Sequence, residues 1–192
     1  PRQRRATGMK FTQLELSNFG VYRGNVIIPL KPTGLGKNIV LVGGLNGRGK
    51  TTILDAIQIA LYGSRSMAVS SRREYEASIT RRFSRTANSS DPFSVSITFE
   101  WERNGDASII QLSRQWNLEG VFQERVVVCR DGEVDIALTE NVSDFIEEIL
   151  PVDISGLFLF DGEKIEALAK PQQSSRIISH AIHALLGTGL IE

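Results

Sequence analysis

The sequence predicts an α/β domain, and three observations lead to that prediction. A short apolar run, 39–42, is followed at once by a glycine-rich loop. Apolar residues then recur at helical spacing from Ile53 to Leu61. Farther along, apolar and polar residues alternate over 93–101, which is typical of a half-buried strand. Together these patterns predict a strand–loop–helix unit combined with an antiparallel sheet.

Length and composition fit one globular unit. Of the 192 residues, 41% are hydrophobic and 23% are charged, which excludes the disordered and membrane-spanning classes. No apolar run approaches the ~18 residues of a membrane span, and no signal peptide is recognisable, so we expect a cytoplasmic protein with no membrane partner. The 22 basic residues balance 22 acidic ones, so any contact with nucleic acid must be local.

The N-terminal part predicts a hairpin and a buried strand. Residues 1–8 are polar and Arg-rich and precede a Met-Lys-Phe start at residue 9, so we expect them to be a leader or an expression remnant. Apolar residues at 11–16 and 26–28 predict two strands joined by a turn. The continuous apolar run 39–42 predicts a central strand covered on both faces.

A helix and an antiparallel sheet are predicted next. The helix from Ile53 to Leu61 ends at Gly63, whereas the polar segment 64–90 supports no firm assignment. Further strands are predicted at 93–101, around 110–116 and at 126–129, and a turn at 131–132 leads toward Val134 and Ile136. We therefore expect an antiparallel subdomain near residues 93–136.

The last part of the chain predicts a helix, a strand and a second helix. Apolar spacing predicts a helix over 143–150, which Pro151 prevents from continuing. The run 157–160 predicts a second buried strand that ends at Asp161. Residues 177–186 form an apolar helical stripe.

The segment Gly44-Leu45-Asn46-Gly47-Arg48-Gly49-Lys50-Thr51 matches a phosphate-binding P-loop. Glycines let backbone N–H groups close around phosphate oxygens, and the start of the following helix adds the positive end of its dipole. Lys50 should reach the β- and γ-phosphates, and Thr51 should place its hydroxyl on Mg²⁺. The cofactors we predict are ATP and Mg²⁺. The predicted nucleotide-binding residues are Gly44, Leu45, Asn46, Gly47, Arg48, Gly49, Lys50, Thr51 and Thr52.

Asp161 is the candidate for a further metal ligand, and with Lys50 it completes the predicted catalytic set. Four apolar residues that end in an acid are typical of a Walker B strand, which would bring Asp161 beside Mg²⁺ and make Glu163 a candidate activator of water. The alternative is an acidic loop that follows a core strand.

Several motifs also carry a resemblance to a known family. They are Leu16-Ser17-Asn18-Phe19-Gly20-Val21-Tyr22, the loop at 43–52, Leu54-Asp55-Ala56-Ile57-Gln58, Leu61-Tyr62-Gly63 and Phe158-Leu159-Phe160-Asp161-Gly162-Glu163-Lys164-Ile165. Over about 9–192 the chain resembles the DndD family, the SMC-like ATPases of DNA phosphorothioation systems.

This resemblance implies the N-terminal lobe of an SMC/ABC-type ATPase head. In that wider family, which includes double-strand-break-repair and RecF-like ATPases, the head is split into two lobes joined by a long coiled coil. It implies that 9–192 ends before the coiled coil and hydrolyses ATP poorly without the C-terminal lobe. The implied partners are DNA, that lobe, a second head in a homodimer, and other DNA sulfur-modification proteins. Repair ATPases carry glutamine at the position of Asp161, so its role stays open.

Other functions also stay open. A self-sufficient P-loop NTPase or kinase would use 157–161 as its own Walker B strand, and a nucleotide-sensing scaffold would bind ATP without turnover. A repair or recombination ATPase of the RecF-like type is a further alternative. The arginines between Arg72 and Arg85 fit either DNA phosphates or a solvated helix face. Trp101 and Trp116 are predicted to pack in the core.

Overall fold

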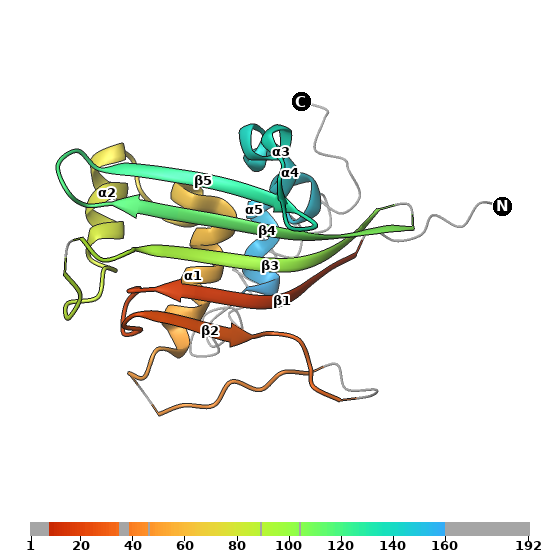
Figure 1. Cartoon of the computed structure of the whole chain (residues 1–192), viewed down its shortest axis with the longest axis horizontal. Coiled ribbons are helices and arrows are strands. Elements are labelled where there is room, and N and C mark those ends of the chain that lie inside the picture. The colour runs from red at the N-terminus through yellow and green to blue at the C-terminus, as the bar shows by residue number, and fades with distance from the viewer. Residues whose placement is uncertain (1–7, 35–38, 46, 89, 104, 160–192) are drawn as a thin grey trace, which may run out of the picture. The chain divides into compact units, whose positions relative to one another are not determined.

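The computed structural model describes residues 8–34, 39–45, 47–88, 90–103 and 105–159 (Figure 1). The chain divides into two compact units, Pro1–Val142 and Ser143–Glu192. The predicted helix at 177–186 lies outside the described residues, as do Asp161 and Glu163. Within the described residues, no helix has the length and apolar character needed to cross a membrane.

One antiparallel sheet of six strands forms the first unit. The strands are β1 (Gly8–Ser17), β2 (Asn25–Pro29), β3 (Ser94–Arg103), β4 (Asp106–Asn117), β5 (Gln123–Arg130) and β6 (Glu133–Val134), in the order β2-β1-β3-β4-β5-β6 (Figure 1). The predicted N-terminal hairpin is confirmed as β1 and β2, and the alternating segment is confirmed as β3. Each hairpin is local, but β1 and β3 join segments that are far apart in the sequence.

The strands predicted as a separate subdomain near 93–136 share this sheet with the N-terminal hairpin. Leu14 lies opposite Ile97 and Leu16 lies opposite Val95, and all four side chains are buried. Sequence alternation gives the buried face of a strand but not its neighbour, so the continuity of the sheet was not predicted. The last strand also ends earlier than predicted: Ile136 begins a helix, because the Asp135 side chain accepts the Leu138 N–H at 2.9 Å and caps it.

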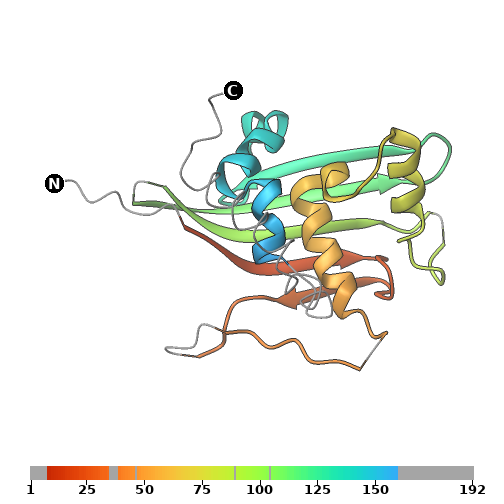
Figure 2. The ribbon, with the colours of Figure 1, turned by 180° about the vertical axis from the view of Figure 1, so that it is seen from behind.

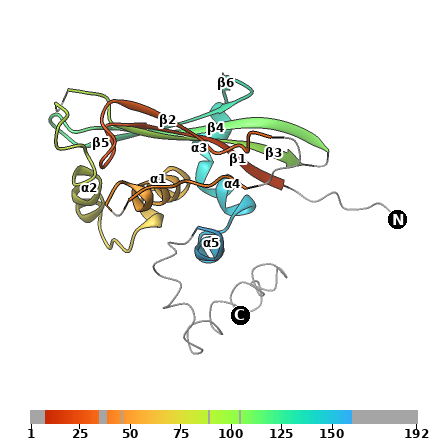
Figure 3. The same cartoon turned by 90° about the horizontal axis from the view of Figure 1, so that it is seen from below.

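Helices cover one face of the sheet. They are α1 (Lys50–Tyr62), the 3-10 turn η1 (Gly63–Ser66) and α2 (Arg72–Thr80), with α3 (Ile136–Glu140) following β6. Figure 3 shows α1 and α2 on the same side of the strands. The predicted helix before Gly63 is therefore confirmed. Its buried residues Ile53, Ile57 and Leu61 recur at helical spacing, and α1 packs on β3 and β4.

An aromatic cluster fills the core where β1 ends and β3 begins. The Phe93 ring lies 5.9 Å from Phe19 and 5.0 Å from Trp116, measured between ring centroids. Trp116 is 3% exposed and Trp101 is 8% exposed. The prediction that both tryptophans pack in the core is confirmed.

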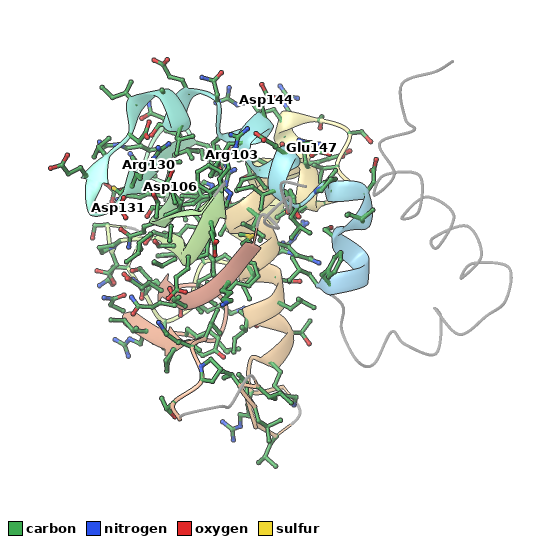
Figure 4. The ribbon with its side chains drawn as sticks, turned by 90° about the vertical axis from the view of Figure 1, so that its right-hand side faces the viewer. Arg103, Asp106, Arg130, Asp131, Asp144 and Glu147 are labelled. Atoms are coloured by element: carbon green, nitrogen blue, oxygen red, sulfur yellow. The ribbon has the colours of Figure 1, made fainter. Side chains whose placement is uncertain are left out.

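A turn at Asp131 follows the C-terminal end of β5 (Figure 4). Asp131 has a φ of 53°, and its carboxylate accepts the Ile109 N–H at 2.8 Å. The neighbouring Arg130 forms an ion pair of 3.1 Å with Asp135. These bonds fix the strand end and the start of α3 together.

The predicted buried strand at 39–42 is wrong for this chain. Ile39 is 83% exposed and Leu41 is 91% exposed, and the segment has no regular structure. A central strand needs hydrogen-bonded neighbours and cover on both faces. Within the described part of the chain, no strand pairs with this run.

The second predicted buried strand is also wrong over its described part. α4 (Val142–Ile149) stops before Pro151, as predicted, and α5 (Val152–Phe158) then runs through the first residues of the predicted strand. Pro151 precedes α5, and the Leu159 N–H donates to the Ser155 carbonyl at 2.7 Å. An apolar run of four residues does not distinguish a strand from a short helix.

Candidate nucleotide-binding site

The glycine-rich loop turns directly into α1. Gly47 and Gly49 have φ angles of 75° and 98°, and α1 begins at Lys50. No side chain caps the helix, and no acidic residue lies in its first turn. The first N–H groups of a helix have no partner within it, and its dipole is positive there. The start of α1 therefore suits an anion, and the residues fit a bound phosphate.

Lys50 folds back over this loop. Its Nζ donates to the Gly44 carbonyl at 2.8 Å and to the Leu45 carbonyl at 3.1 Å. The ammonium is exposed, so the loop carries an accessible positive charge beside the helix start.

The turn between β1 and β2 packs against the loop, a contact that sequence reasoning missed. The Tyr22 hydroxyl donates to the Gly49 carbonyl at 3.2 Å, and burial raises the pKa of Tyr22, which keeps the hydroxyl protonated as a donor. Gly20 lies against the side chain of Thr52 in the first turn of α1. The motif at 18–22 was visible in the sequence, but its partner was not.

Asn18 holds that turn in place. It has a φ of 51°, its Nδ2 donates to the Pro92 carbonyl at 2.8 Å, and its Oδ1 accepts the Gly24 N–H at 2.8 Å. Its carbonyl also accepts the Ser84 N–H at 2.8 Å. Asparagine tolerates positive φ better than most residues, and here its side chain satisfies two backbone groups.

The arginines between Arg72 and Arg85 do not all have the same role. Arg82 forms an ion pair of 3.3 Å with Asp55 on α1 and donates to the Ser78 carbonyl at 3.0 Å. It therefore links α1 to the end of α2. The others are exposed, namely Arg72, Arg73, Arg81 and Arg85.

The far end of α1 is held by Arg114 of β4. Its Nε donates to the Ala60 carbonyl at 2.8 Å, and its guanidinium pairs with Glu124 at 3.1 Å. The Tyr75 hydroxyl also donates to Glu124, at 2.8 Å. Burial, and then the Glu124 charge, raise the pKa of Tyr75, so it stays a donor. One buried guanidinium thus joins α1, α2 and the sheet.

Most of the predicted nucleotide-binding residues come together at the start of α1. Gly44 and Leu45 accept from Lys50, Arg48 is exposed, and Thr51 and Thr52 lie in the first helical turn. Asn46 and Asp161 lie outside the described residues.

Comparison with known proteins decides the family. A family model described as an AAA domain matches residues 13–183, most of the chain. The chain belongs to this AAA domain family. The match includes the whole loop, α1 and all strands from β3 onward. An AAA domain of mixed α/β content with an antiparallel sheet is consistent with a P-loop ATPase.

One curated relative of this AAA domain protein is the DNA double-strand break repair Rad50 ATPase of Halobacterium salinarum. The two are 41% identical over 59 residues, which is 31% of this chain. The aligned part is only 6% of the relative's length. Taken with the family match, this similarity indicates the SMC/Rad50-like class of ATPases.

Proposed function

We propose that this chain is the ATP-binding, N-terminal lobe of an SMC-like ATPase head that acts on DNA. The observation that carries the proposal is the loop at the start of α1, with left-handed glycines, no helix cap and Lys50 above it. The AAA domain match and the Rad50 similarity support ATP as the nucleotide.

Each residue of the loop then has a role. Backbone N–H groups from Gly47 to Thr51 surround the phosphates, and Lys50 contacts the β- and γ-phosphates. Thr51 and Asp161 would hold Mg²⁺, which prefers oxygen ligands. Asn46 would contact the nucleotide that a second head covers.

The exposed run at 39–42 supports the proposal that a second lobe completes the head. Four consecutive apolar residues lie next to the P-loop without a strand beside them among the described residues. We infer that the C-terminal lobe pairs with this run and so finishes the nucleotide site. Two completed heads then sandwich two ATP molecules. Hydrolysis of the bond to the γ-phosphate lets the two heads separate.

DNA sulfur modification is the setting that the sequence resemblance favours. The motifs at 16–22 and 158–165 resemble those of the DndD family, and the Rad50 relative is named for DNA double-strand break repair. We therefore propose DNA, and the other proteins of a phosphorothioation system, as partners.

Titration calorimetry with Mg-ATP tests the nucleotide site. We expect the chain combined with its C-terminal half to bind Mg-ATP, and Lys50→Ala to weaken binding at least about tenfold, because it removes a charge-assisted contact. Lys31→Ala is the matched control, since Lys31 pairs with Glu100 on the sheet and not with the loop. If both variants bind Mg-ATP equally tightly, Lys50 does not contact the nucleotide.

Hydrolysis measurements separate this proposal from its rivals. We expect negligible turnover by the 192-residue chain alone and restored turnover when the C-terminal half is added. Steady turnover by the chain alone would instead favour a self-sufficient NTPase or kinase. Binding without turnover in the combined protein would favour a nucleotide-sensing scaffold.

A further inference from the structure

A cavity that is open to solvent lies at the other end of α1 from the P-loop. Its volume is about 610 Å³, and it is lined by residues of η1, of the segment 67–71, of the start of α2, and of the start of β5 with the residue before it. The 13 residues of α1 separate it from the P-loop by about 20 Å, at 1.5 Å of rise per residue. Figure 2 shows α2 beside the end of α1 that is farther from the loop. This volume is within the usual range for small-molecule sites.

Two arginines lie on the rim of the cavity. Arg65 and Arg72 line it together with Ser64 and Ser70. Arg72 forms no ion pair with any other residue that the structure describes, and its side chain is exposed. Guanidinium and hydroxyl groups are the usual side-chain donors to phosphate oxygens.

One wall of the cavity is apolar. Met67, Val69 and Phe122 line it, and Phe122 is held edge-on against Tyr75 with ring centroids 6.2 Å apart. Phe122 is only 7% exposed, so it is a fixed part of the wall. The half-buried side chains of Met67 and Val69 supply the accessible part of this wall, which suits an aromatic ring, and methionine adapts to its outline.

Glu124 adds a hydrogen-bond acceptor to the lining. Its Oε1 already accepts from Arg114, whose positive charge offsets that of the carboxylate, and from the neutral Tyr75 hydroxyl. Its second oxygen retains capacity to accept an N–H. The cavity therefore combines anion donors, an apolar wall and one acceptor for an amino group.

We propose that this cavity binds a nucleoside phosphate, at a site separate from the P-loop. The phosphate would contact Arg65 and Arg72, the base would lie against Met67, Val69 and Phe122, and an exocyclic amino group would donate to Glu124. Adenine and cytosine both carry such a group. An acidic peptide fits less well, because Asp and Glu side chains carry no ring to lie against the apolar wall of Met67, Val69 and Phe122. The ligand is either a free nucleotide or the end of a nucleic-acid strand.

Binding of AMP and CMP to the Lys50→Ala protein, without magnesium, tests the proposal. That variant is expected to weaken nucleotide binding at the P-loop, and the variants of Arg72 and Arg73 described next assign the remaining AMP binding to the cavity, so the result does not depend on the proposed ATPase function. By equilibrium dialysis we expect saturable binding of AMP, and at least about tenfold weaker binding of ribose 5-phosphate, which lacks the base.

Adjacent arginines on α2 provide a matched pair of variants. In the Lys50→Ala background, Arg72→Ser should weaken AMP binding about tenfold, whereas Arg73→Ser, which makes the same charge change outside the cavity, should leave it unchanged. Val69→Trp should block binding by filling the cavity while it keeps every charge. Circular dichroism confirms that each variant is folded.

The remaining outcomes identify the source or overturn the site. If a 5′-phosphorylated deoxyadenosine oligomer displaces AMP and its unphosphorylated form does not, the natural ligand is the end of a nucleic-acid strand. If neither oligomer displaces AMP, the ligand is a free nucleotide. The proposal fails if AMP does not bind, if Arg72→Ser and Arg73→Ser behave alike, or if a hexapeptide of Asp and Glu competes as well as AMP.

Discussion

Gly49 is the residue on which the geometry of the P-loop most directly depends. It precedes α1 with a φ of 98°, and its carbonyl accepts from Tyr22. A Cβ atom at this position would lie 2.7 Å from Val21 Cγ2 and 2.8 Å from the Tyr22 hydroxyl. Both the backbone angle and the close approach of the β1–β2 turn therefore require glycine.

Replacing Gly49 with alanine should disturb stability and nucleotide binding together. We expect Gly49→Ala to lower the free energy of unfolding by about 2 kcal/mol, because a left-handed alanine and a steric overlap are both unfavourable. Urea denaturation measures the loss, and Mg-ATP calorimetry should show weaker binding. Gly43→Ala is the control, since its Cβ would meet nothing within 4 Å. An equal effect of the two changes would contradict this view.

Sequence spacing was enough to place the residues of the loop itself. Gly47, Gly49 and Lys50 stand in a motif whose residue types follow from the chemistry of phosphate binding, and the structure brings them together. Gly20 and Tyr22 were not given a role, because their contact with the loop joins separate parts of the chain and has no local pattern.

At the scale of elements, α1 is held at two points. Near its middle Asp55 pairs with Arg82, and near its end the Ala60 carbonyl accepts from the buried Arg114. Gly63 has no side chain, and this allows the Arg114 guanidinium to approach the helix end closely. The helix that carries the P-loop is thereby attached to both α2 and the sheet.

Removing the buried guanidinium should be costly. Arg114→Leu leaves Glu124 without its positively charged partner and the Ala60 carbonyl without its side-chain donor. We therefore expect the free energy of unfolding to fall by about 3 kcal/mol. Arg125→Leu, an exposed arginine on the neighbouring strand, should change it by less than about 0.5 kcal/mol. Urea denaturation compares the two variants. Similar midpoints would show that the bonds of Arg114 to Glu124 and Ala60 contribute little to stability.

Periodic elements were predictable, whereas of three uninterrupted apolar runs predicted as strands only 126–129 is a strand, within β5. The alternation over β3 and the helical spacing over α1 each specify one buried face. The runs 39–42 and 157–160 indicate only that apolar side chains are favoured away from water, and not which secondary structure buries them. Whether such a run becomes a strand depends on neighbouring strands, which the sequence of the run does not contain.

At the scale of the whole molecule, the exposed run at 39–42 is the surface that the proposed C-terminal lobe would cover. We expect Leu41→Asp to leave the free energy of unfolding of the 192-residue chain unchanged within about 0.5 kcal/mol, because Leu41 is 91% exposed. The same change should weaken association with the C-terminal half at least about tenfold, since it would bury a charge in the proposed joint.

Pull-down titrations and urea denaturation measure these two quantities on the same protein. Val121→Asp is the control, because it introduces the same charge at a side chain that is 76% exposed elsewhere on the surface. If Leu41→Asp associates as tightly as Val121→Asp, the C-terminal lobe does not cover this run.

The pairing of β1 with β3 affects how the chain folds during synthesis. Their partnered residues, such as Leu14 and Ile97, are about 80 residues apart, and the P-loop and α1 lie between them. At translation rates of ~5–20 residues per second, the N-terminal hairpin leaves the ribosome roughly 4–16 s before the strand that completes its pairing. During that interval the apolar face of the hairpin lacks its neighbouring strand. We therefore expect the nascent chain to need chaperone protection until β3 emerges.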